Sequence, residues 1–196
     1  MSNWQSLLAR CNKALLEARE LPLQRDYDVR AIQYFGFPAA NERDIADAEA
    51  RLGRRLPPSL RTFYAASNGW RIVGPFIYAV PPVHSLAWLR DSDPELCESV
   101  DVDGDDDQSV AVMRSLAVSS HGDASVWILD PDETDERGEW RAGRWSAWYP
   151  GTDWIAADFY SLFESEVAFM EESNRKDGEP GATDNPDDAQ RLREDH

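Results

Sequence analysis

The chain has 196 residues, of which 42% are hydrophobic, and its 37 acidic and 20 basic residues give a formal net charge of −17. This length suits one domain with a substantial core. The charge argues against direct binding to nucleic acid and against docking on an anionic membrane, because both need clustered Lys and Arg. No apolar run approaches the roughly 18 residues of a spanning helix, and the start of the chain lacks a signal-peptide pattern, so we expect a cytoplasmic protein.

Three helices are predicted in the first seventy residues. The first begins with a capping box at Ser2, carries an apolar stripe from Trp4 to Leu15 and ends near Leu21. The second covers residues 41–53, with Asn41 as its N-cap and Gly53 as a left-handed C-cap. The third begins at the Pro57-Pro58 pair and ends before Asn68-Gly69.

The pattern then changes to that of short strands. They are predicted at residues 70–80 (one or two strands broken at Gly74-Pro75), 115–120, 124–130 and 139–149, with a short helical turn or strand edge at 84–92. Hairpin-like turns are expected at His121 to Asp123 and around Gly143. A last amphipathic helix within residues 153–173 has an apolar stripe that begins at Ile155.

This order of elements predicts an α+β domain, in which helices pack on one face of a mainly antiparallel sheet and a C-terminal helix closes the fold. We divide the chain into an N-terminal helix with its connector (1–35), the domain itself (36–173) and a flexible acidic tail (174–196).

The negative charge is concentrated in one part of the chain. Residues 1–90 have a net charge of +4 and the tail only −3, whereas residues 91–173 carry 22 acids and 4 bases. Such a segment serves either as a solvated surface that maintains solubility or as a face for a basic partner. The candidate partner-binding residues are Asp101, Asp103, Asp105, Asp106, Asp107, Asp130, Asp132 and Trp148.

The sequence offers no convincing catalytic or metal site. It lacks G-x-S-x-G and phosphate-binding loops, and His84 and His121 stand outside any zinc-ligand spacing. The aspartates of residues 101–107 resemble a calcium loop, but Asp106 and Val112 occupy the places of the required Gly and Glu. We therefore expect no enzyme, no metal and no cofactor.

Most of the eight tryptophans are expected in the core, with Trp140 or Trp148 the best candidates for partial exposure. The two cysteines, Cys11 and Cys97, form no disulfide framework, and Cys11 stands where a core residue belongs.

One stretch also resembles a known family. Its pattern is Ile45, Glu49, Leu52-Gly53, Leu56-Pro57, Ser59-Leu60, Phe63-Tyr64 and Asn68-Gly69, and further matches are Val118 to Asp123, Leu129-Asp130 and Ala157 to Phe159. This pattern is similar to that of the SUKH superfamily, which contains the Smi/Knr regulators of fungal cell-wall synthesis and many bacterial immunity proteins. The resemblance covers about residues 36–172.

The resemblance implies a non-catalytic binding protein, because the bacterial members bind and block toxins, often nucleases. Together with the acidic segment, it predicts a basic toxin domain as the protein partner. The alternative is an intracellular regulator or scaffold of the Smi/Knr type, linked for example to cell-wall synthesis.

Overall fold

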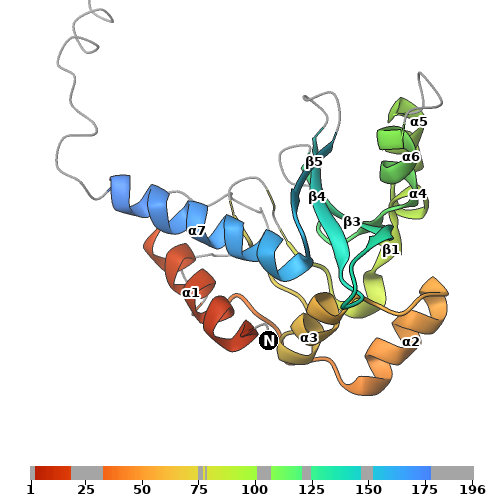
Figure 1. Ribbon diagram of the computed structural model, residues 1–196. Helices are drawn as coiled ribbons and strands as arrows, with labels where there is room; N and C mark the ends of the chain where they lie inside the picture. The colour runs from red at the N-terminus through yellow and green to blue at the C-terminus, as the bar shows by residue number, and fades with distance from the viewer. Residues whose placement is uncertain are drawn as a thin grey trace, which may run out of the picture.

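The computed structural model describes residues 3–18, 33–74, 77, 79–100, 107–120, 125–146 and 152–177. They form an α+β fold around a five-stranded antiparallel sheet of order β1-β2-β3-β4-β5, as predicted (Figure 1). The strands are β1 (Ala87–Trp88), β2 (Leu116–Ala117), β3 (Ser125–Thr134), β4 (Trp140–Ser146) and β5 (Thr152–Ala156). The helices are α1 (Trp4–Glu17), α2 (Glu42–Leu52), α3 (Pro58–Ala66), the 3-10 turn η2 (Val83–Ser85), α4 (Leu89–Ser92), α5 (Pro94–Val100), α6 (Asp107–Arg114) and the closing helix α7 (Phe159–Asp177).

Helices cover both faces of the sheet. Because side chains alternate along a strand, Trp127 and Leu129 of β3 join the main core with α1, α3 and α7. Val126 and Ile128 point the other way into a smaller core beneath α4, α5 and α6. This second layer adds to the single helical layer expected from the sequence, and it explains why β3 is apolar at consecutive positions.

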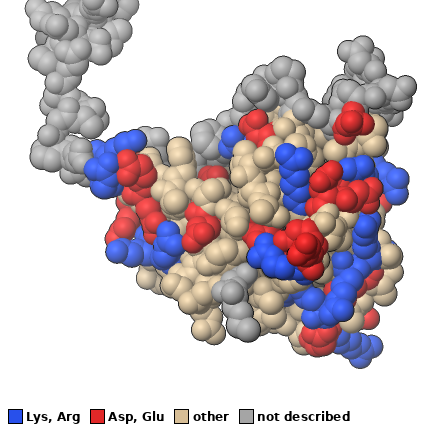
Figure 2. All heavy atoms as spheres, in the orientation of Figure 1, with Lys and Arg blue, Asp and Glu red and all other residues tan. Residues whose placement is uncertain are grey.

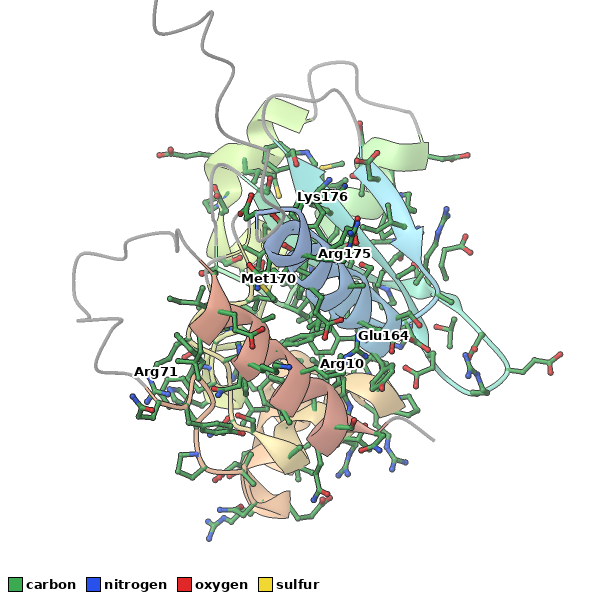
Figure 3. All side chains as sticks on the ribbon, turned by 90° about the vertical axis from the view of Figure 1, so that its left-hand side faces the viewer. Arg10, Arg71, Glu164, Met170, Arg175 and Lys176 are labelled. Atoms are coloured by element: carbon green, nitrogen blue, oxygen red, sulfur yellow. The ribbon has the colours of Figure 1, made fainter. Side chains whose placement is uncertain are left out.

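The N-terminal helix α1 packs along α7 at the other end of the sequence. The Trp4 ring lies 5.1 Å from Phe63 and 5.5 Å from Phe163, and its indole N–H donates to the Ser59 carbonyl. Figure 3 shows Arg10 of α1 facing α7, where it donates two hydrogen bonds to Glu171.

The predicted ends of α1 were wrong at both sides. Its N-cap is Asn3, whose side chain accepts from the backbone N–H of Ser6, rather than Ser2, which lies outside the described residues. The helix ends at Glu17 because Ala18 is already extended, four residues before Leu21.

The ends of α2 and the start of α3 are as the sequence predicts. Asn41 forms a reciprocal capping box with Asp44, and Gly53 ends α2 with a φ of 68°, in the left-handed region that favours glycine. Pro57 is the N-cap of α3 and offers no side-chain acceptor to the free N–H groups of the first turn.

Two predictions around β4 and β5 were wrong. Gly143 lies inside β4 opposite Ile128 rather than in a turn. Glycine suits this position because a Cβ would approach the Asp153 carbonyl oxygen to 2.9 Å. Ile155 belongs to β5 and is 52% exposed, so it is no part of the buried stripe of α7.

The closing helix itself begins at Phe159, where Asp158 accepts from the N–H of Ser161, and runs to Asp177, four residues into the predicted tail. Its remaining predicted stripe, from Phe159 to Met170, is buried.

The strand predicted at 70–80 is reduced, within the described residues, to bridges of Trp70 with Gly36 and Val80. Residues 84–92 contain parts of both expected structures, a helical turn and a strand edge. The turn predicted at His121 to Asp123 lies outside the described residues. Among the described helices, none has an apolar stretch long enough to cross a membrane.

Candidate functional site

The sequence-predicted site residues do not form one cluster within the described part of the chain. Asp101, Asp103, Asp105, Asp106 and Trp148 lie outside it. Asp107 is exposed at the start of α6.

Asp130 is only 1% exposed, and its carboxylate accepts hydrogen bonds of 2.7 and 2.6 Å from Arg114. This pairing raises the pKa of the Arg114 guanidinium above its ordinary value. Asp130 therefore holds β3 to the end of α6 and presents no surface to a partner. Asp132 is exposed, but Arg54 and Arg114 approach its carboxylate to 3.2 and 3.5 Å.

A different set of acids remains unpaired at the surface. We define the acidic patch as Asp91, Glu95 and Asp107, on α4, α5 and α6. On the right-hand side of the molecule, Figure 2 shows acidic and basic side chains interspersed. Asp91 has only a 4.0 Å contact with Arg90, and neither Glu95 nor Asp107 forms an ion pair with any residue that the structure describes.

Three acids of α7 behave differently because bases neutralise them. Glu164 and Glu171 share Arg10, and Glu172 is paired with Arg175 and Lys176. These two bases lower the pKa of Glu172 to about 2.

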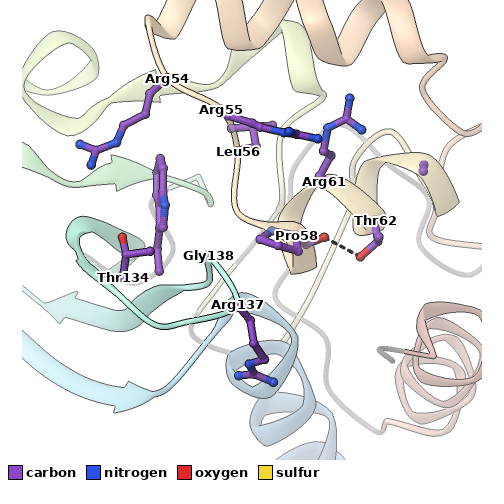
Figure 4. Close-up of a pocket in the computed structure, with 11 residues that line it drawn as sticks. Arg54, Arg55, Leu56, Pro58, Arg61, Thr62, Thr134, Arg137 and Gly138 are labelled. Carbon is purple, nitrogen blue, oxygen red and sulfur yellow. Dashed lines mark hydrogen bonds between the residues drawn. The ribbon is translucent and has the colours of Figure 1, made fainter.

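A groove of about 680 Å³ lies between the α2–α3 loop, α3 and the β3–β4 hairpin (Figure 4). Four arginines line it, namely Arg54, Arg55, Arg61 and Arg137, together with apolar atoms of Leu56, Pro58 and Trp140. No acidic residue is among its lining residues. Sequence reasoning missed this groove, although the Arg54-Arg55 pair directly after the Gly53 cap was a visible signal.

Glu139 holds the hairpin against α3. It is buried, and Ser59 donates to it three times, from its backbone N–H at 2.9 and 3.1 Å and from its hydroxyl at 2.6 Å. Burial raises the pKa of Glu139, and the bonds from Ser59 oppose that rise. The carboxylate thus supplies from another segment the N-terminal cap that Pro57 lacks.

Trp140 forms the end wall of the groove. It is 4% exposed, so the prediction of partial exposure was wrong for this residue. Its ring is stacked on Trp88 at 6.3 Å, and the Arg54 guanidinium lies 5.5 Å from its centre. Arg54 also donates to the Pro131 carbonyl, which fixes this side of the groove.

The four arginines differ in how far they are neutralised. Arg61 donates to Glu42 and Glu49, and Arg137 to Asp135. Arg61 in turn lowers the pKa of Glu42, with a smaller contribution from the charge of Arg55. Arg55 itself forms no hydrogen bond and no ion pair with the residues that the structure describes, and Figure 4 shows it pointing toward Arg61.

His84 gives no sign of a catalytic base. It lines a smaller hollow of about 350 Å³ with Asp44 and Asp47, but its side chain is exposed and no described carboxylate hydrogen-bonds to its ring. Within the described ranges, no group of three or more His, Cys, Asp or Glu is placed to hold a metal ion.

Comparison with protein families identifies a match for most of the chain. The model of the SMI1/KNR4 family (SUKH-1) matches residues 39–181. This range takes in α2, α3, the whole sheet and α7, and it leaves out α1. No curated protein matched the chain.

Proposed function

The chain belongs to the SMI1/KNR4 family (SUKH-1), and from this membership we propose that it is a non-catalytic domain that neutralises a toxin by binding it. The proposed partner is a basic toxin domain of the nuclease type. The acidic patch covers the cleft with which that toxin binds phosphates.

The observation that supports this proposal is that two of the three acids of the acidic patch, Glu95 and Asp107, have no ion-pair partner among the described residues, while Asp91 has only the long contact with Arg90. Exposed acids that are already paired, like those of α7, contribute little to the field outside the protein. Glu95 and Asp107 have no such partner among the described residues, so their charge reaches the solvent. A nuclease cleft is basic because it must hold phosphates, and opposite charge on the inhibitor steers the two proteins together.

The proposal is tested with the protein encoded by the neighbouring reading frame, expressed in the same cells. We expect the full chain to relieve growth arrest caused by that protein and to bind it in a pull-down at low salt, with an association rate that falls as salt increases. No binding at low salt and no relief of growth arrest would overturn the proposal.

The role of the patch is tested by charge reversal. The triple variant Asp91→Lys, Glu95→Lys, Asp107→Lys is expected to slow association about tenfold or more, since steering by surface charge changes association rates by roughly 10 to 1,000-fold. A matched control carries the same change of charge elsewhere, at the exposed residues Glu17, Asp47 and Asp177. If both variants slow association equally, or if neither does, the patch has no specific role.

A further inference from the structure

We propose that the arginine-lined groove is a second binding site, which takes an acidic, extended peptide segment of a protein partner. This site goes beyond the proposed toxin neutralisation and lies on different elements from the acidic patch. Its anchors are Arg55 and Arg61, and exposed Pro58 adds an apolar contact surface.

The charge of the groove favours an anionic occupant. All four of its charged lining residues are arginines, whereas the acids that pair with three of them stand outside the lining. The guanidinium of Arg55 has no hydrogen-bond or ion-pair partner in the described part of the chain, so it is available to an incoming carboxylate. The Glu42 partner of Arg61 is 73% exposed, so a carboxylate of the ligand can replace it at little cost.

The arrangement of the arginines favours a peptide over a single phosphate. Figure 4 shows Arg54 and Arg137 at opposite sides of the groove, and only Arg55 and Arg61 lie toward one another. One small anion therefore reaches at most a pair of them. A segment that carries several carboxylates with apolar side chains between them matches both the spread of charge and the exposed surface of Pro58.

The groove is also rigid. Arg54 is held by Trp140, Pro131 and Asp132, and the hairpin is fixed to α3 through Glu139. A site whose walls are already ordered loses less conformational entropy when a ligand binds.

The test selects peptides from a display library of random eight-residue sequences on the full chain at low ionic strength. We expect Asp and Glu to be enriched on the wild-type protein. The enrichment should be lost on the Arg55→Glu variant and kept on Arg43→Glu, a control on α2 whose arginine is 88% exposed and lies outside the groove. A selected peptide should bind the Arg55→Glu variant about tenfold or more weakly, measured by fluorescence polarisation.

Three results would overturn the proposal. The first is no enrichment of acidic residues, and the second is equal enrichment on the wild type and on Arg55→Glu. The third is displacement of a bound selected peptide by inorganic phosphate or a short single-stranded oligonucleotide at a lower concentration than the unlabelled peptide needs for the same displacement. Because Arg55 is exposed and unpaired among the described residues, Arg55→Glu is expected to keep the unfolding midpoint of the wild type. The two proposals can fail separately, since Arg55→Glu should keep protection from the toxin and the lysine variant of the acidic patch should keep peptide binding.

Discussion

Replacement of Glu139 by Ala is expected to destabilise the protein by about 2–3 kcal/mol. The variant leaves two donors of Ser59, its N–H and its hydroxyl, without their acceptor, in a residue that is 1% exposed. A buried donor that loses its partner costs about 1–3 kcal/mol, so the two together cost about 2–6 kcal/mol. Removing a buried charge, whose pKa burial has raised, returns part of that cost.

The measurement is urea unfolding at pH 7, followed by far-UV circular dichroism. Glu139→Gln keeps an acceptor of the same shape, so its loss should be smaller, about 1 kcal/mol. Glu136→Ala on the same hairpin is the control, because this exposed acid has no hydrogen bond within the described residues, and its effect should stay within about 0.5 kcal/mol.

A double-mutant cycle with Ser59→Ala separates the contact from other effects, because the two changes should be far from additive. A loss below about 1 kcal/mol for Glu139→Ala, or additive losses in the cycle, would refute the reasoning that this carboxylate caps α3.

Two further predictions concern the interior. Burial raises the pKa of Glu166 above its ordinary 4.5, against an opposing effect of Arg144. The folded state therefore binds the proton more tightly than the unfolded state, and stability declines as pH rises from 4.5 through the raised pKa of the folded state. Glu166→Gln lacks this decline. Its free energy of unfolding in urea should therefore rise relative to that of the wild type between pH 4 and pH 7. Parallel pH dependences of the two free energies would contradict this prediction. Gly143→Ala places a Cβ 2.8 Å from Trp154 and should cost about 1–3 kcal/mol at pH 7, and an unchanged urea midpoint would argue against this close packing.

Local signals predicted α2 and α3 well because each signal is contained in a few consecutive residues, whereas α5 and α6 were not predicted. Asn41 and Gly53 mark the two ends of α2, and the structure places both caps as expected. The boundary between β5 and α7 was harder, since Ile155 fits the 3.6-residue period of the helix that follows. Its membership in β5 is decided by pairing with β4, which a pattern along one segment does not report.

The candidate binding surfaces were only partly predictable. Counting charges along the chain located the acidic segment. Only the three-dimensional structure shows that Arg114 neutralises Asp130, whereas Glu95 has no ion-pair partner among the described residues. Arg137 lies about 80 residues after Arg55 and Arg61 in the chain, but all three line the same groove. The contact of Ser59 with Glu139 holds their two segments together. No motif of the sequence reports such a contact.

The packing of α1 on α7 has a consequence for the order in which the chain folds during synthesis. Asn174 donates to the carbonyl of Ala14 across 160 residues, so α1 completes its contacts only after α7, much later in the chain, has been synthesised. Until then part of its apolar face, including Trp4, which packs on Phe159 and Phe163, stays open to chaperones and to other nascent chains. Closing so long a loop is slow, and we expect docking of the two end helices to be the last step of folding.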